Sequence, residues 1–337
     1  FRVLVRLKGY PAQSATFDRK TDAKKWAQQT ESAIREGRHF KTAEAKKHTL
    51  GEMIDRYLRD VLPHRKKGQQ KQKSLLEWWK EALGPYALAE VTPALIAECR
   101  DQLLNGTTYR GTQRSPATVV RYMAALSVVF NLAVNEWEWL EVSPMAKVKK
   151  PKEPRGRVRF LDQEERERLL DACHKSRSRL LYPIVVLAIS SGMRQGEILG
   201  LTWKDVDFIR RRVVLHETKN DERRAVPVTG LAHELLQELS KVRRIDSHLV
   251  FPGNNPEKPV DFRHDWEKAL KEAKIEDFRF HDLRHTAASY LAMNGATLAE
   301  IAEVLGHKTL QMVKRYAHLS EAHTASVVDR MNEKIFG

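Results

Sequence analysis

The segment H-D-L-R-H-T-A-A-S-Y-L-A-M at residues 281–293 decides the character of the second half of this 337-residue chain. From residue 286 onward the segment is mostly apolar, which predicts a helix anchored against a core. His281 and Arg284 stand about one helical turn apart, so their side chains leave one face and can reach one anion. Asn294 and Gly295 predict the end of this helix.

Residues suited to the same anion stand on either side of this helix. Downstream, residues 298–305 predict a short helix that ends before His307, and Tyr316 follows. Upstream, the apolar segment 182–191 predicts a buried helix that delivers Arg194. Arginine donates in parallel to two phosphate oxygens, histidine exchanges a proton near neutral pH, and tyrosine offers a hydroxyl nucleophile. The set as a whole suits phosphate chemistry.

These residues belong to five motifs whose order resembles that of the tyrosine recombinases, the phage-integrase type of site-specific DNA recombinase. The resemblance to the catalytic domain covers about the second half of the chain, and a weaker one covers the first half. It implies a multidomain, mainly α fold with small β-sheets, in which a mixed α+β catalytic domain follows a helical domain. The motifs are R-Q-G-E at 194–197, T-K-N at 218–220, H-D-L-R-H-T at 281–286, L-G-H-K-T at 305–309 and R-Y-A-H at 315–318.

The resemblance implies that several of these side chains bind the scissile phosphate. Arg194 and Arg284 are expected to hold its non-bridging oxygens and to stabilise the charge of the pentacoordinate state. His281 and His307 are expected to donate hydrogen bonds to it, with His281 also handling the proton of the nucleophile. Glu197 is expected to orient its neighbours, or to act only at the start of a helix. Alone, either histidine would be interpreted as structural.

The resemblance also implies how bonds form and break. Tyr316 would attack phosphorus, form a covalent 3'-phosphotyrosine and release a 5'-hydroxyl; a tyrosine packed on a terminal helix is the alternative. Lys219, expected at a hairpin tip, would protonate the leaving 5'-oxygen. The phosphotyrosine keeps the energy of the broken bond, so no ATP is expected. No metal is expected either, because positive side chains do the work that metal ions do elsewhere. His281 and His285 stand four apart, as zinc ligands can, but no glutamate follows His281 as in H-E-x-x-H and no further ligand is evident.

The composition favours a polyanionic partner. Lys and Arg total 59 against 44 Asp and Glu, and the net charge of +15 with a pI near 9.7 does not distinguish DNA from RNA or an anionic membrane. No apolar run approaches the ~20 residues that span a bilayer, and no signal peptide is visible. Cys99 and Cys173 lack metal or disulfide spacing, so we expect reduced thiols in a cytoplasmic protein. The family resemblance implies a bacterial cytoplasm and association with the nucleoid. Phe1 is not an initiator residue, so residues are expected to precede it.

Breaks in the pattern divide the chain into four parts. The first resembles the arm-type DNA-binding domain of phage integrases with one strand of its sheet missing. A generic ββα cap has the same pattern. The second predicts four helices, as in a core-binding (SAM-like) domain or an ordinary bundle. The third is rich in proline and basic residues, as in a hinge that closes two domains around a duplex, or in a solvated linker. The predicted boundaries are 1–40 for the arm-type domain, 48–145 for the helical domain, 146–159 for the basic linker and 160–337 for the catalytic domain with a C-terminal tail helix.

Within these parts, local patterns predict the individual elements. Thr21, Thr49 and Asp162 are interpreted as helix N-caps. Residues 40–47 are interpreted as a charged connector, and the basic segment 64–73 as a loop. The predicted strands are 1–7, 15–17, 211–215, 224–228 and 249–252, and the predicted helices are 18–37, 50–62, 74–83, 92–104, 115–136, 164–173, 182–191, 196–201, 231–242, 262–273, 286–293, 298–305 and 321–336.

Basic residues outside the motifs are candidates for contacts with the DNA backbone. Lysine and arginine neutralise phosphates, although basic runs are more often only solvated. The candidates are Lys66, Lys67, Lys71, Arg114, Arg121, Lys149, Lys150, Arg155 and Arg157.

The leading hypothesis is a recombinase that integrates or excises a phage or other mobile element at specific sites in duplex DNA. The resemblance implies a homotetramer on DNA, a monomer in solution, and accessory DNA-bending proteins; no membrane partner is expected. The tail helix at 321–336 would dock on a neighbouring protomer or fold back on its own domain. A type IB-like topoisomerase without sequence choice is the alternative enzyme. A DNA-binding protein that has lost its chemistry is the non-enzyme alternative.

Overall fold

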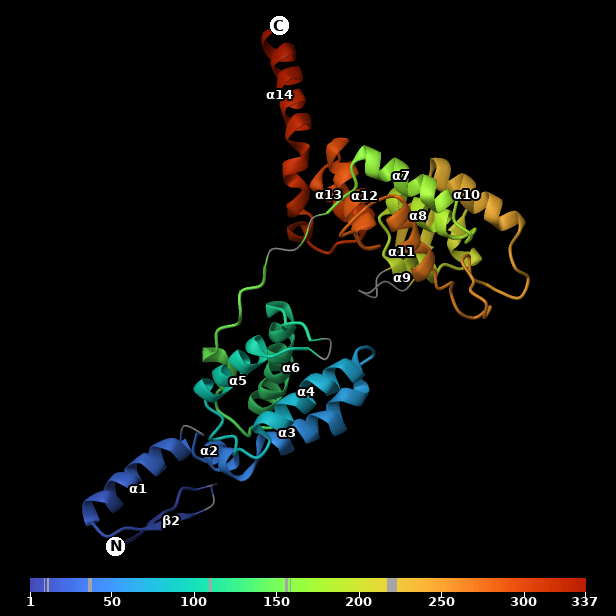
Figure 1. The fold of residues 1–337 in the computed structure, drawn as a ribbon. Helices are drawn as coiled ribbons and strands as arrows, with labels where there is room; N and C mark the ends of the chain where they lie inside the picture. Colours follow the sequence, from blue (N-terminus) through green and yellow to red (C-terminus); the bar gives the residue numbers. More distant parts are fainter. Residues whose placement is uncertain are drawn as a thin grey trace. The chain divides into compact units, whose positions relative to one another are not determined.

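The computed structural model describes residues 1–337 except 9, 11, 36–37, 109–110, 155–156, 158 and 217–222, and the side chains of 38–42 and 320–327 are likewise not described. The chain forms two compact units, Phe1–Arg155 and Gly156–Gly337, coloured blue to green and green to red in Figure 1. Both are mainly helical with small antiparallel sheets, which confirms the predicted fold class. The functional division into arm-type, core-binding and catalytic domains stays a prediction.

The first unit begins with a two-stranded sheet and one helix. Strands β1 (Arg2–Val5) and β2 (Gln13–Thr16) pair antiparallel, and α1 (Lys20–Arg35) packs against β1. The buried positions of α1 recur at helical spacing and include Ile34. Thr21 lies inside α1, so its predicted role as the N-cap is wrong.

The predicted connector at 40–47 is instead a helix, α2 (Arg38–Lys47). Its alanine, glutamate and lysine residues are strong helix formers, and Ala45 is buried in the core, so the segment belongs to the packed unit. Helix α3 (Leu50–Arg56) follows with the predicted cap: Thr49 accepts from the backbone of Glu52, and the Glu52 carboxylate accepts from the backbone of Thr49.

The four-helix core departs from its prediction at two points. The predicted helix 50–62 is regular only in α3 and continues as a π-helical turn, η1 (Tyr57–Val61), and a 3-10 turn, η2 (Leu62–His64). Helix α4 (Gln69–Leu83) starts before its predicted start, so part of the basic segment 64–73 is helical and not a loop. Trp79 of α4 anchors the bundle, because its buried indole N–H donates to the Tyr122 carbonyl at 2.9 Å. Helices α5 (Pro93–Asn105) and α6 (Pro116–Asn135) complete it, capped by Thr92 and Ser115.

Helix α6 corrects the prediction that no segment is long and apolar enough to span a membrane. Among the described residues it is the one helix that meets this description, by length and composition only. Much of it lies in the core of the first unit, with buried residues from Val119 to Ala133. Core helices of globular units commonly have this composition.

The predicted basic linker is held at both ends. A 3-10 turn, η3 (Pro144–Lys147), forms at its start, and Val148 packs in the core of the first unit. Within the second unit, Arg157 pairs with Asp277 at 2.5 Å and with Asp282 at 3.1 Å, and Arg159 pairs with Glu165.

The second unit surrounds a buried apolar helix. Asp162 caps the first helix as predicted, in a capping box with Glu165. The predicted strand at 249–252 does not form, because Leu249 and Pro252 make only isolated bridges, and the predicted turn at 219–221 lies outside the described residues. The elements are α7 (Gln163–His174), α8 (Leu181–Ser191), α9 (Gln195–Leu199), η4 (Trp203–Asp205), β3 (Val206–Asp207), β4 (Arg212–Leu215), β5 (Arg224–Pro227), α10 (Gly230–Lys241), α11 (Arg263–Glu272), α12 (Asp282–Met293), α13 (Leu298–Leu305), η5 (Leu310–Met312), η6 (Lys314–Ser320) and α14 (Glu321–Phe336).

One close approach brings the motif segments together. Helix α12 packs along α8, and α13 packs against α12. Gly192 ends α8 with a φ of 62°, and a Cβ there would collide with the Leu305 side chain. Only glycine adopts this positive φ without strain and also leaves room for the Leu305 side chain. The ends of α8 and α13 therefore meet beside the first turn of α12.

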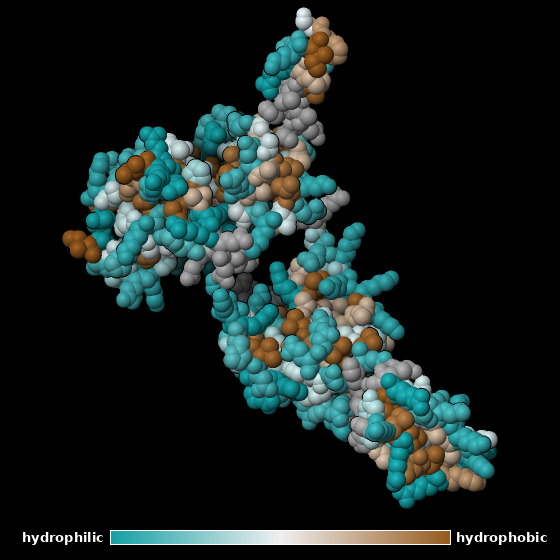
Figure 2. Space-filling model, turned by 180° about the vertical axis from the view of Figure 1, so that it is seen from behind, coloured by the Kyte–Doolittle hydropathy of each residue, from teal (hydrophilic) through white to brown (hydrophobic). Residues whose placement is uncertain are grey.

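The last helix, α14, extends away from the rest of the second unit (Figure 1). It follows directly on η6, and Val328, Met331, Ile335 and Phe336 are exposed. Figure 2 shows brown, hydrophobic atoms on the helix that ends the chain. The helix is amphipathic as predicted; its docking partner stays a prediction.

Candidate active site

Arg284 lies at the meeting point of three segments. It stands in the first turn of α12 with 5% of its surface exposed. Its guanidinium donates to the Gly192 carbonyl at 2.6 Å and to the Leu305 carbonyl at 2.6 Å, and it contacts Nε2 of His307 at 2.8 Å. Burial, together with the nearby charge of Arg194, lowers the pKa of Arg284 to about 10. The guanidinium is therefore fixed before any ligand arrives.

Glu197 holds two further arginines beside this point. Its carboxylate accepts from the Arg194 guanidinium at 2.6 Å, from the Arg194 backbone at 2.9 Å and from Arg224 at 2.7 Å. Burial raises the pKa of Glu197, but these hydrogen bonds and charges together outweigh it and hold the pKa below its ordinary value. Glu197 thus meets the geometry of both predicted roles, since it orients its neighbours and stands in the first turn of α9.

Arg224 is a member of this cluster that the sequence interpretation missed. It lies on β5, and its guanidinium donates to the Val304 carbonyl at 3.2 Å as well as to Glu197. Gly306, with a φ of 64°, has to lack a side chain because a Cβ would collide with this guanidinium. A signal existed: Arg224 stands two residues before the buried Val226, so it occupies a core-facing position of a strand.

The cluster carries excess positive charge and unfilled hydrogen-bonding atoms. Among the described residues, three arginines, Arg194, Arg224 and Arg284, act on the carboxylate of Glu197. Within the described part of the chain, the buried Nδ1 of His307 and Nε of Arg224 have no hydrogen-bond partner. Burial, with the charge of Arg284, lowers the pKa of His307 to about 4, so the ring has no charge of its own near neutral pH. Buried polar atoms without partners are costly, and an anion bound here would supply both the charge and the acceptors.

Tyr316 lies next to this cluster. It stands on η6 with 2% of its surface exposed, and its hydroxyl is hydrogen-bonded to Nδ1 of His285, the residue after Arg284. Burial raises the pKa of Tyr316, and burial together with His281 lowers the pKa of His285 to about 4. From the sequence, His281 was predicted to handle the proton of Tyr316, and His285 was considered only as a zinc ligand. Among the described residues no third metal-ligating side chain joins the two histidines.

The remaining predicted residues are placed as follows. Lys219 and Arg155 lie outside the described residues. Arg114 is half-buried, and Arg157 is paired with Asp277 and Asp282 and so has little charge left for a phosphate. The predicted DNA-contacting residues that are exposed are Lys66, Lys67, Lys71, Arg121, Lys149 and Lys150.

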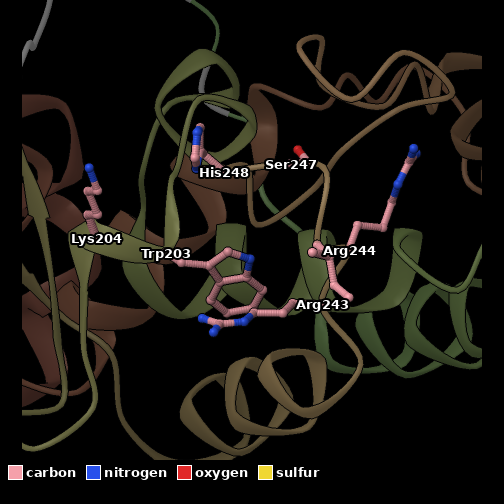
Figure 3. Close-up of a pocket in the computed structure, with 7 residues that line it drawn as sticks. Trp203, Lys204, Arg243, Arg244, Ser247 and His248 are labelled. Atoms are coloured by element: carbon pink, nitrogen blue, oxygen red, sulfur yellow. The ribbon is translucent and has the colours of Figure 1, made fainter.

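A separate hollow of about 310 Å³ lies beside η4 (Figure 3). Arg243 extends toward the indole of Trp203, whereas Arg244 points away and pairs with Asp246 at 2.7 Å. None of the motif residues that the structure describes lines it, so it is distinct from the arginine cluster. Its lining residues are Trp203, Lys204, Arg243, Arg244, Ile245, Ser247 and His248.

Comparison with known proteins places this geometry in a family. The model of the phage integrase family matches residues 159–323. The shufflon-specific DNA recombinase of Escherichia coli is 34% identical over 298 residues, which cover 86% of this chain and 75% of that protein. The integrase of Salmonella phage P22 is 32% identical over 254 residues, which cover 71% of this chain and 63% of that protein.

Solved structures share the fold. The Tn1549 transposon integrase in complex with a circular intermediate DNA superposes with a TM-score of 0.67 at 18% identity, over 84% of this chain and 99% of that chain. A lambda integrase dimer bound to a core site superposes with a TM-score of 0.65 at 20% identity, over 80% of this chain and 95% of that chain. These matches show the fold, and the 34% identity to the E. coli recombinase, over 75% of that protein, shows that the chain belongs to the phage integrase family.

Proposed function

We propose that this chain is a site-specific DNA recombinase that cuts and rejoins DNA through a covalent 3'-phosphotyrosine at Tyr316. The observation that carries the proposal is the cluster in which Arg284, fixed by two main-chain carbonyls, lies beside a buried tyrosine hydroxyl. An anion-binding site next to a nucleophile is what phosphoryl transfer requires.

The scissile phosphodiester is the anion that this cluster suits. The forks of Arg194 and Arg284 match two phosphate oxygens, and their positions are set by Glu197 and by backbone carbonyls before the substrate binds. His307, with its Nδ1 unpartnered among the described residues, supplies a further contact. Charge that develops on the non-bridging oxygens therefore meets preorganised donors in a largely buried site.

The reaction exchanges one phosphate ester for another. The Tyr316 oxygen attacks phosphorus, the bond from phosphorus to the 5'-oxygen breaks, and Lys219 gives that oxygen a proton. The enzyme keeps the 3'-phosphate as a tyrosine ester, so a 5'-hydroxyl from another strand can reverse the step without ATP. Strand exchange follows when the two 5'-hydroxyls differ.

Duplex DNA is the proposed partner, in the bacterial cytoplasm at the nucleoid. The net charge of +15 supports it, and the related E. coli protein is by name a DNA recombinase. A homotetramer on DNA, accessory DNA-bending proteins and a mobile element as the source of the sites remain part of the proposal. A type IB-like topoisomerase would use the same chemistry without choosing a sequence.

The proposal is tested with suicide substrates, in which a nick lets the leaving strand diffuse away. The substrates are tiled across the ends of the mobile element that encodes the protein. A protein–DNA adduct that survives denaturation is expected on a small subset of the tiles. Adducts of equal yield on every tile would favour the topoisomerase. Absence of any adduct from folded protein would refute both.

We predict that cleavage continues in the presence of EDTA. The charge that metal ions supply in other phosphoryl-transfer enzymes is supplied here by the guanidinium groups of Arg194, Arg224 and Arg284. Adduct formation is measured after dialysis against the chelator, with a metal-dependent nuclease as the positive control. Activity that disappears and returns on addition of magnesium would contradict this mechanism.

We also predict that affinity for duplex DNA falls steeply with salt. Each neutralised phosphate contributes a slope of about 0.9 in log K against log salt, and the exposed lysines of the first unit add to those of the second. Lys67→Gln should reduce the slope by about one contact. Lys175→Gln is the matched control, because Lys175 is paired with Asp171. A wild-type slope typical of one or two contacts would contradict an extended DNA interface.

A further inference from the structure

Among the described residues, the Tyr316 hydroxyl makes one polar contact, its hydrogen bond to His285. His285 follows Arg284 directly on α12. The residue that is hydrogen-bonded to the tyrosine therefore stands next to the arginine that we propose binds the phosphate. The rings of His281 and His285 lie with centroids 5.5 Å apart and nearly perpendicular. The two rings thus lie close together at the start of α12, where His281 is the N-cap residue, and it is His285 that is hydrogen-bonded to the nucleophile.

The surroundings of Tyr316 leave its proton few destinations. The side chain packs in a small apolar cluster with Ile301, Leu305 and Val313, all fully buried. A hydroxyl in such a site loses its hydrogen-bonding alternatives in water. The imidazole Nδ1 is therefore the acceptor that the fold supplies.

We propose that His285 takes the proton of Tyr316 as its oxygen attacks phosphorus and returns it when the strand is rejoined. This inference rests on the proposed function. The Tyr316 oxygen forms a bond to phosphorus while its proton passes to Nδ1 of His285, which becomes an imidazolium. The bond from phosphorus to the 5'-oxygen breaks, and Lys219 protonates that oxygen. In the reverse direction the attacking 5'-hydroxyl returns its proton to Lys219 as its oxygen bonds to phosphorus. The bond from phosphorus to the Tyr316 oxygen breaks, and the imidazolium returns its proton to that oxygen, so protons and charge balance over the cycle.

The electrostatic setting makes this acceptor respond to the substrate. Without DNA, burial and the surrounding cations keep His285 neutral, and a neutral ring has the lone pair that an acceptor needs. A bound phosphodiester brings negative charge that offsets those cations, so the imidazolium becomes easier to form when the substrate is present. Among the described residues, the groups that act on the ring are the N-cap residue His281, Asp282 and Arg284 of α12, and Arg315 and Tyr316 of η6.

Two substitutions separate proton transfer from positioning. In His285→Asn the amide oxygen can accept the hydrogen bond near the place of Nδ1 but cannot take a proton; His285→Ala removes both functions. Both variants are expected to form adduct roughly 100-fold or more slowly than the wild type, with DNA affinity unchanged. His248→Asn is the matched control at the exposed hollow beside η4, and its rate should equal that of the wild type. If His285→Asn reacts at the wild-type rate, the inference is overturned.

A change at the nucleophile gives a second, independent readout. A fluorinated tyrosine at position 316 has a lower phenol pKa and depends less on a base. It is expected to restore at least tenfold in rate to His285→Asn and to restore nothing to Arg284→Lys, whose deficit is in phosphate binding. Equal responses of the two variants would overturn the role of His285. The rates with fluorotyrosine and with tyrosine at position 316 are compared within the same variant. A loss of stability in His285→Asn therefore lowers both rates and leaves their ratio unchanged.

The outcomes also separate this inference from the proposed function. If wild-type protein forms no adduct on any substrate, the recombinase proposal fails and this inference fails with it. If the wild type forms adduct while His285→Asn matches it, only the assignment of the proton acceptor is lost.

Discussion

Replacement of Tyr316 by phenylalanine is expected to abolish the covalent protein–DNA adduct while leaving DNA affinity unchanged. The substitution removes only the hydroxyl, and the ring keeps its buried place against α12 and α13. The lost hydrogen bond to His285 costs about 0.5–1.5 kcal/mol, too little to unfold the unit. Adduct is measured on denaturing gels with labelled suicide substrate, and affinity by fluorescence anisotropy with an intact duplex.

Tyr182→Phe is the matched control for this prediction. Tyr182 lies half-buried on α8, where its ring meets His174 edge-on, and it belongs to no motif. Its variant should form adduct at the wild-type rate. Adduct that persists in Tyr316→Phe would place the nucleophile elsewhere in the chain.

Lys219→Ala is expected to lose two to four orders of magnitude in cleavage of ordinary DNA, the usual contribution of a general acid. An alkoxide leaves poorly without a proton, whereas a thiolate leaves readily, since the pKa of an ordinary thiol is about 8.5. DNA in which the scissile 5'-oxygen is replaced by sulfur should therefore restore most of the activity. Single-turnover cleavage of the two substrates gives the comparison directly.

Arg284→Lys is the control for the sulfur experiment. Lysine keeps the positive charge but lacks the fork that bonds the Gly192 and Leu305 carbonyls and a phosphate at once. Its deficit concerns the non-bridging oxygens, which the substitution at the bridge leaves in place, so sulfur should not rescue it. If sulfur rescues both variants equally, the assignment of Lys219 as the proton donor is wrong.

Features with a local cause could be predicted from the sequence. The caps at Thr49 and Asp162 depend on residues three positions apart, and both form capping boxes. The end of α13 at Gly306 likewise follows from one glycine in a left-handed conformation. The membership of Arg194 and Arg284 in one cluster was predicted from motif order, and the structure brings their charges together.

Features that depend on tertiary contacts could not be predicted in the same way. Residues 40–47 looked like a solvated connector because they are highly charged, yet Ala45 is drawn into the core of the first unit. The π-helical turn at Tyr57–Val61 has no local signal, since its residues also suit a regular helix. His281 and His285 occupy equivalent positions in a helical pattern, and only the fold of η6 decides which of them meets Tyr316.

The way in which Arg284 is held bears on how this protein can change over evolutionary time. Its two shortest contacts are to main-chain carbonyls, and a main-chain carbonyl survives any substitution of the residue that carries it. Neighbouring side chains can therefore drift without releasing the guanidinium, so long as the backbone path is kept. That path depends on Gly192, where a side chain would collide with Leu305. Most substitutions around Arg284 should therefore leave its position unchanged, whereas a substitution at Gly192 should displace it.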